Sequence, residues 1–210
     1  SRGVKVTGLV LAENQQEFIQ NLIRKKHLPG EVRLQDFLSF SPRDRYDAIV
    51  NFGVIEHIPQ YRQFFRQVWD CLSPGGGFYL DASATREKFD KSDFSAQFIW
   101  PGAHTFMCLQ SVIRELLFHG LDLLRVENES HDYELTMKHW AENLEAHRDS
   151  IVSRVGEACY RAFRLFLWGG HHAFFRDQLQ AYSLLARRSE HPGPRHGPLK
   201  RLVTAFQEAG

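Results

Sequence analysis

A chain of 210 residues, of which 43% are hydrophobic and 24% charged, is long enough to bury a core as one globular domain. The formal net charge of +1 provides no overall basic field, which argues against a nucleic-acid partner. The three cysteines lack CxxC spacing and predict buried thiols without a metal site. No apolar run reaches about 18 residues, so we expect no transmembrane helix and take the cytoplasm as the default location.

The first two thirds of the chain alternate between strand and helix patterns. Apolar and β-branched runs predict strands over residues 4–11, 31–37, 46–52, 78–84 and 121–129. Helical spacing of apolar residues predicts helices over 13–27, 59–72 and from Leu109 to Gly120. This alternation is typical of an α/β fold with a parallel sheet and crossover helices.

The pattern changes after residue 133. Residues 134–177 are predicted to be helical almost throughout, with a break at Gly169 and Gly170. The run "QAYSLLARR" (180–188) could form a closing strand, so the domain is predicted to span residues 1–188. The Pro-, Gly- and His-rich residues 189–210 are predicted to be a flexible tail.

Polar groups follow the predicted strands at the edge where open parallel sheets bind ligands. The stretch "YDAIVNFGVIEH" (46–57) leaves a buried strand and at once places Glu56 beside His57. Glu56 could belong to a functional site. It could equally serve only the helix predicted to begin at residue 59, where a carboxylate suits the helix dipole.

The segments "VTGLVLAENQ", "VRLQDF" and "YDAIVNFGVIEH" together resemble the S-adenosylmethionine-dependent methyltransferases of the cyclopropane-fatty-acyl-phospholipid synthase family. That family includes the mycolic acid cyclopropane synthases. The resemblance continues through "LSPGG", "FIWPG" and "DYELTMKHWAENL" and extends to about residue 188. It implies a Rossmann-like class I methyltransferase sheet with helical lid insertions, and S-adenosylmethionine as cofactor.

The resemblance also implies cofactor-binding residues. Leu11 and Gln15 match the family segment that runs along the ribose and methionine side of the cofactor. Leu34 and Gln35 match the dipeptide that flanks the adenine. The family's first βα unit, with its Gly-rich loop, has no counterpart in these residues. We therefore expect them to be a C-terminal portion of a longer protein that alone binds cofactor weakly or not at all.

The family further implies a reaction centre. Glu56 and Tyr133 match residues that help to hold a bicarbonate ion beside the transferred methyl group, while we give His57 a structural role. Asp81 and Ser83 stand where the family has histidine and isoleucine, so the ion site is altered. Our hypothesis is that Asp81 replaces bicarbonate as the base that removes a proton after methylation.

The resemblance implies methyl transfer to a hydrophobic acceptor, with the double bond of an unsaturated fatty acyl chain as first choice. Residues 158–175, rich in aromatic side chains, are either a lid over an acyl-chain tunnel or an ordinary core helix. The alternatives are a small-molecule N- or C-methyltransferase and a degenerate, non-catalytic binding module. A lipid or other hydrophobic small molecule is the expected partner, and peripheral membrane contact stays open.

Overall fold

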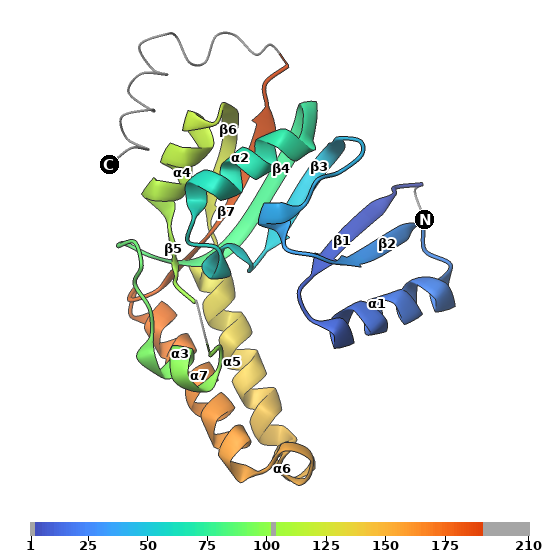
Figure 1. Cartoon of the computed structure of the whole chain (residues 1–210). Coiled ribbons are helices and arrows are strands. Elements are labelled where there is room, and N and C mark those ends of the chain that lie inside the picture. The colour runs from blue at the N-terminus through green and yellow to red at the C-terminus, as the bar shows by residue number, and fades with distance from the viewer. Residues whose placement is uncertain (1–2, 102–103, 191–210) are drawn as a thin grey trace. The chain divides into compact units, whose positions relative to one another are not determined.

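The computed structural model describes residues 3–101 and 104–190 and divides the chain into two units, Ser1–Arg45 and Tyr46–Gly210 (Figure 1). We call these the N-terminal and the C-terminal unit. The predicted tail lies outside the described residues from position 191 onward.

The N-terminal unit is a β-α-β element. Strands β1 (Val6–Val10) and β2 (Gly30–Leu34) are parallel, in register from Val6 opposite Gly30 to Val10 opposite Leu34, and α1 (Glu13–Lys26) connects them. The second strand ends three residues before its predicted limit, because the Asp36 side chain accepts a hydrogen bond from the Leu38 backbone and starts a short 3-10 helix, η1 (Phe37–Ser39).

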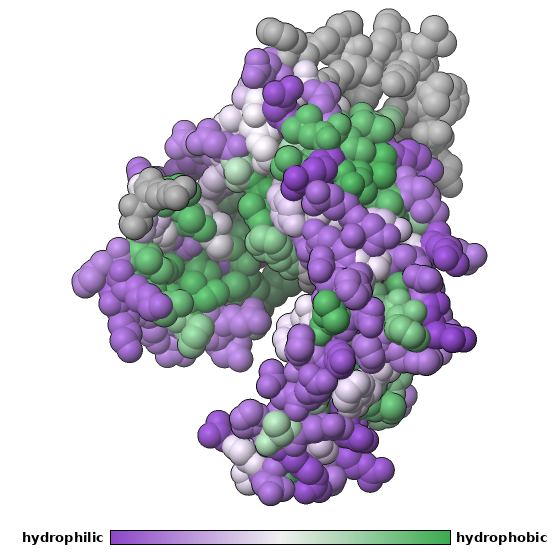
Figure 2. Space-filling view, turned by 180° about the vertical axis from the view of Figure 1, so that it is seen from behind, coloured by the Kyte–Doolittle hydropathy of each residue, from purple (hydrophilic) through white to green (hydrophobic). Residues whose placement is uncertain are grey.

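Two strands and one helix bury little hydrophobic surface. Val6 and Phe18 are 58% and 69% exposed. Figure 2 shows hydrophobic side chains among the charged ones at the surface of the molecule.

The C-terminal unit is built on a sheet in the order β3-β4-β7-β6, with the short strand β5 paired to β4. Its strands are β3 (Tyr46–Phe52), β4 (Leu72–Thr85), β5 (Met107–Cys108), β6 (Leu121–Asn128) and β7 (Gln180–Arg188). The helices on the chain between β3 and β6 are η2 (Ile55–His57), α2 (Tyr61–Cys71), α3 (Asp93–Phe98) and α4 (Leu109–Phe118). The predicted α/β fold class is confirmed.

The closing strand has a direction that the sequence pattern left open. The segment 180–188 is a strand, as predicted, but it lies inside the sheet and pairs antiparallel with both β4 and β6. The cause is the helical hairpin before it: α5 (Ser130–Ala146) leads away from the end of β6, and α7 (Glu157–Phe175) returns to the same end (Figure 1). A chain that returns to the edge it left can re-enter the sheet only in the opposite direction.

The core of the C-terminal unit lies between the sheet and α2. The helical spacing predicted for residues 59–72 is confirmed, because α2 buries Tyr61, Phe64, Phe65 and Val68. Rings of Phe64 and Phe65 meet Phe78 of β4 at centroid distances of 6.1 and 5.9 Å, in edge-to-face geometry. These contacts fix the register of β4, whose alternate residues then point to the opposite face.

The predicted helix break at Gly169 and Gly170 is wrong, because α7 runs through both residues. The hairpin is interrupted instead around α6 (Arg148–Val155), at His147 and at Gly156, whose φ of 84° favours glycine. Gly170 has a packing role: a Cβ added there would meet the Met137 Cε of α5 at 2.3 Å. The glycine allows α7 to approach α5 closely, beside the buried Met137, Ala141, Leu167 and Phe174.

No helix in the described ranges 3–101 and 104–190 is both long and apolar enough to cross a membrane. Within those ranges the three cysteines are free thiols, with Cys71 and Cys108 buried as predicted and Cys159 half-buried.

The two adjacent glycines of α7 provide a matched test of this packing. Gly169→Ala meets nothing within 4 Å and should raise the free energy of unfolding by about 0.5–1 kcal/mol through helix propensity. Gly170→Ala gains the same backbone contribution but must displace Met137, so it should be roughly 1 kcal/mol less stable than Gly169→Ala. Urea denaturation measures both, and equal stability of the two variants would show that the Met137 methyl moves aside at no cost.

Candidate functional site

Glu56 lies in η2, directly after β3, and is 5% exposed. Its Oε1 accepts hydrogen bonds from the Ser83 backbone N at 3.0 Å and from the Ser83 Oγ at 2.9 Å. Burial raises the pKa of the Glu56 carboxyl, and hydrogen bonds from its own backbone and from Ser83 offset part of the rise. Its Oε2 is buried without a hydrogen-bond partner. Glu56 is therefore a buried acid held in place by Ser83 of β4.

Asp81 and Tyr133 form the second element of the site. Asp81 is two residues before Ser83 on β4 and so lies on the same face of the sheet. The Tyr133 hydroxyl, in the first turn of α5, donates a hydrogen bond to the Asp81 Oδ1. Burial, followed by the hydrogen bond to Asp81 and its negative charge, raises the pKa of the Tyr133 phenol. The fold thus brings together all three predicted reaction-centre residues, Glu56, Asp81 and Tyr133, at one face of β4.

Glu129 is a fourth member that our sequence analysis missed. It precedes α5, its backbone N–H donates to the Ala181 carbonyl of β7 at 2.9 Å, and Asp81 and Ser183 are among the groups that influence its pKa. Burial is the largest cause that raises the pKa of Glu129, and neighbouring Asp81 raises it further, while the Ser183 hydrogen bond lowers it. The signal was available in the sequence, because Glu129 ends the predicted strand 121–129, at the same sheet edge as Glu56 and Asp81.

An aromatic cluster lies beside Glu56. His57 is 5.1 Å from His104 between ring centroids, and His104 stacks on Trp100 at 4.5 Å. Trp100 in turn meets Phe166 of α7 edge-on at 5.0 Å. Burial, followed by the nearby His57, lowers the pKa of His104 to about 4, so its imidazole is neutral at physiological pH. These contacts accord with a structural role for His57, which stays a prediction.

The predicted cofactor residues lie together in the N-terminal unit. Val10 and Leu34 are directly opposite each other at the carboxyl ends of β1 and β2, and the Gln35 backbone N–H donates to the Val10 carbonyl at 3.0 Å. Leu11 and Leu34 are 76% and 42% exposed, and Gln15 is exposed in the first turn of α1. Exposed apolar and amide side chains at the carboxyl edge of parallel strands suit a nucleoside-containing cofactor.

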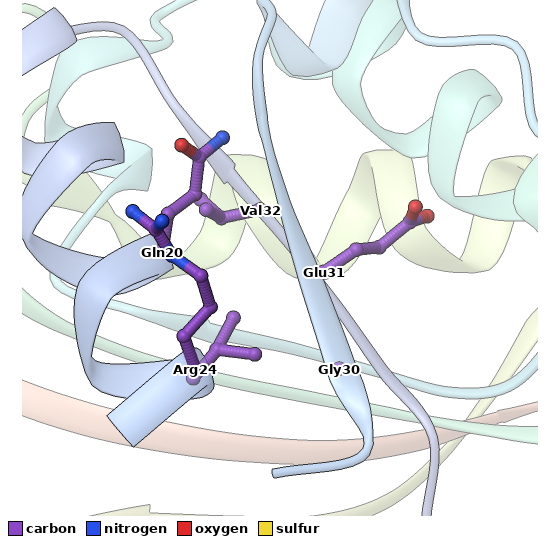
Figure 3. A pocket seen from close by; sticks show the side chains of 6 residues that line it. Gln20, Arg24, Gly30, Glu31 and Val32 are labelled. Atoms are coloured by element: carbon purple, nitrogen blue, oxygen red, sulfur yellow. The ribbon is translucent and has the colours of Figure 1, made fainter. Parts of the chain in front are cut away.

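Two hollows lie away from these residues. A cavity of about 300 Å³ in the N-terminal unit is lined by Gln20 and Arg24 of α1 and by Val32 and Gly30 of β2 (Figure 3). It borders the amino end of β2, the edge opposite Leu34. A groove of about 500 Å³ on the helical hairpin is lined by Glu145, Arg161, Arg164, Leu165 and Trp168. Glu145 is twelve residues beyond Tyr133 on α5, or roughly 18 Å along the helix axis.

Comparisons with known proteins identify the relatives of the chain. A sphingolipid C9-methyltransferase B of Emericella nidulans is 29% identical over 175 residues, which cover 79% of this chain and 34% of the relative. A probable fatty acid methyltransferase of Mycobacterium tuberculosis is 28% identical, covering 95% of this chain and 48% of the relative. The chain thus spans half or less of the length of these relatives.

Solved structures agree in fold. The structure of the mycolic acid cyclopropane synthase CmaA1 complexed with SAH and CTAB superposes with a TM-score of 0.80 at 21% identity, covering 88% of this chain and 70% of that one. The family model described as mycolic acid cyclopropane synthetase matches residues 1–184. The match spans both units and confirms the resemblance found in the sequence: the chain belongs to the mycolic acid cyclopropane synthetase family.

Proposed function

We propose that the protein transfers a methyl group from S-adenosylmethionine to a hydrophobic acceptor, and that this acceptor is the double bond of an unsaturated acyl chain. The observation that carries the proposal is the pair of acids at one face of β4. Asp81 accepts a hydrogen bond from Tyr133, and Glu56 accepts one from Ser83. Family membership and relatives named for fatty acid and sphingolipid methylation support the lipid acceptor.

When bound, the cofactor supplies an electrophilic methyl group. The residues proposed to hold it are the exposed Leu11, Gln15 and Leu34 and the half-buried Gln35, all at the carboxyl edge of β1 and β2. The remaining chemistry falls to the acids of the C-terminal unit.

Addition of a methyl group to a double bond leaves a positive charge on the acceptor carbon, and a base must then remove a proton. We assign this role to Asp81. Its Oδ1 is held by Tyr133, while its other oxygen can take the proton, and the C–H electron pair closes a ring or forms a new double bond. Glu56 contributes negative charge when ionised, which stabilises the cation. In this scheme bicarbonate is unnecessary.

The lid proposal rests on α7. Phe174 of α7 lies 5.6 Å from the Tyr133 ring, and Phe166 contacts Trp100. An acyl chain reaching Asp81 would therefore pass beside α7. The apolar cavity that this requires stays a prediction.

A small-molecule N-methyltransferase is the second candidate. The observation in its favour is the group of three carboxyls around Tyr133, those of Asp81, Glu56 and Glu129, whose negative charges raise the pKa of its phenol. Such a centre also attracts an ammonium group. A non-catalytic binding module is the third candidate and would show no methyl transfer to either acceptor.

Cofactor binding should depend on the carboxyl edge of β1 and β2. S-adenosylmethionine is expected to bind the complete, longer protein with micromolar affinity by calorimetry, and Gln15→Ala and Leu34→Asp in that protein should each weaken it by roughly 10-fold or more, about 1.4 kcal/mol. Val4→Asp, which places the same charge on a 64% exposed side chain before β1, is the control and should bind normally. Absence of binding heat and of a thermal shift in the wild type would exclude the cofactor assignment.

Asp81→Asn tests the base. Because the amide cannot accept the proton, methyl transfer should fall by ~100-fold or more, and added bicarbonate should change neither the mutant nor the wild type. Asp122→Asn, at an exposed position of β6, is the matched control and should keep full activity. A wild type that requires bicarbonate, or an Asp81→Asn variant with near-normal activity, would assign the proton transfer elsewhere.

A further inference from the structure

Strand β4 continues past the end of β3, and Glu56 occupies the place that β3 leaves beside it. The parallel pairing ends with Phe52 opposite Asp81, where the Gly53 N–H donates to the Asp81 carbonyl at 2.8 Å. The chain then turns into η2, and β3 offers no acceptor to the next outward N–H of β4, that of Ser83. A backbone N–H inside a sheet needs a hydrogen-bond partner. The Glu56 Oε1 provides it at 3.0 Å.

The Ser83 hydroxyl adds a second donor to the same oxygen. It donates to the Glu56 Oε1 at 2.9 Å. Glu56 is also fixed through its main chain, because its carbonyl accepts from the Thr105 N–H at 2.8 Å. Both donors of Ser83 thus act on Oε1, while Oε2 is buried without a hydrogen-bond partner. A buried polar atom without a partner is costly, so a fold that keeps one at this centre indicates a role in function.

A carboxylate held in this way is suited to stabilise a charge that develops during a reaction. Little water screens a buried carboxylate, and a group that is already fixed needs no reorganisation when the charge appears. Methyl transfer to a double bond or to an amine creates such a positive charge on the acceptor. The Ser83 hydrogen bonds also favour the ionised form of Glu56, and so oppose burial, which raises the pKa of this carboxyl.

We propose that Ser83 is a positioning residue, which fixes Glu56 through Oε1 and reserves Oε2 for the cationic centre that methyl transfer creates on the acceptor. The inference rests on the proposed methyl transfer. No proton moves to Glu56 in this step, because Glu56 acts through its charge and Asp81 remains the base. Ser83 therefore affects the chemical step through Glu56, without touching the acceptor or the cofactor.

A matched set of serine variants tests this role in the complete, longer protein. Ser83→Ala removes the hydroxyl donor and keeps the backbone donor, whereas Ser83→Thr keeps both. Ser73→Ala is the control. Ser73 lies near the start of β4 and is half-buried like Ser83, and its side chain makes no hydrogen bond to any residue of the ranges 3–101 and 104–190.

The division between kcat and KM separates a positioning role from a merely structural one. Because the cation forms only as the methyl is transferred, Ser83→Ala should lower kcat by roughly 10-fold and leave KM for acceptor and cofactor near wild type. Ser83→Thr should restore the rate, and Ser73→Ala should match the wild type. Glu56→Gln should lose at least as much as Ser83→Ala. Adding Ser83→Ala to Glu56→Gln should cost little more, because Ser83 acts through Glu56.

The acid side of the pH–rate profile gives a second readout. The rate should rise with pH as Glu56 ionises. Loss of the Ser83 hydroxyl removes a hydrogen bond that lowers the pKa of Glu56 against the effect of burial, so Ser83→Ala should move this rise to higher pH. The other titratable groups near Glu56 are His57 of η2, Tyr61 of α2, Asp81 of β4, His104 before β5 and Tyr133 of α5. In a Glu56→Gln background, Ser83→Ala should leave the profile unchanged, which would exclude these groups as the source of the shift.

Carbon-13 NMR of the Glu56 carboxyl judges the contact without any acceptor. The signal should titrate at higher pH in Ser83→Ala than in the wild type, and Ser73→Ala should titrate as the wild type does. An unshifted titration, a Ser83→Ala variant with normal kcat, or a loss that Ser83→Thr does not restore would overturn the positioning role. A wild type that methylates nothing, but whose Glu56 titration responds to Ser83→Ala, would support Ser83 as the residue that fixes Glu56 and reject only the proposed function.

Discussion

The antiparallel strand β7 between β4 and β6 is the constraint on which the proposed reaction centre depends. It places Ser183 opposite Asp81 and offers the Ala181 carbonyl to Glu129. The hairpin of α5 and α7 that forces this direction also delivers the Tyr133 hydroxyl to Asp81. A fully parallel sheet would remove Ser183 from Asp81 and the Ala181 carbonyl from Glu129, whereas Glu56 would stay beside Ser83 of β4.

The acids of this centre impose an energetic cost that the fold offsets locally. Burial disfavours the ionised form of Glu56, and two adjacent carboxylates disfavour each other. Two Ser83 donors, the backbone N–H and the hydroxyl, hold Glu56, and the Tyr133 phenol donates to Asp81. A polar network of this kind is held rigidly only when its members are satisfied. The Glu56 Oε2 departs from this pattern, because it is buried without a hydrogen-bond partner, and burial raises the pKa of this carboxyl.

Patterns within one sequence segment predicted the features that depend on that segment alone. The apolar spacing of α2 predicted its buried face, and polar residues after β3 and β4 predicted Glu56 and Asp81 as neighbours. The position of β7 in the strand order depends on pairing between segments about 50 to 100 residues apart, as between Glu127 and Ser183 or Asp81 and Ser183. A local sequence pattern does not encode such pairing. Gly169 and Gly170 were wrongly predicted to break the helix. The reason for a glycine at position 170 is its contact with Met137, which belongs to another helix and is not visible in the local sequence. Glu129 was missed because polar residues were sought after only four of the five predicted strands, and Glu129 ends the fifth.

The measurement that tests the account most directly is mass analysis of lipids after incubation of the protein with S-adenosylmethionine carrying a trideuterated methyl group and with unsaturated phospholipid. If a base at Asp81 removes a proton from the transferred methyl to close a ring, the labelled product should keep two of the three deuterons on the acyl chain. A product that keeps all three deuterons on an amine nitrogen, or lipids that carry no label while the cofactor is bound, would contradict methylation of an acyl double bond at this centre.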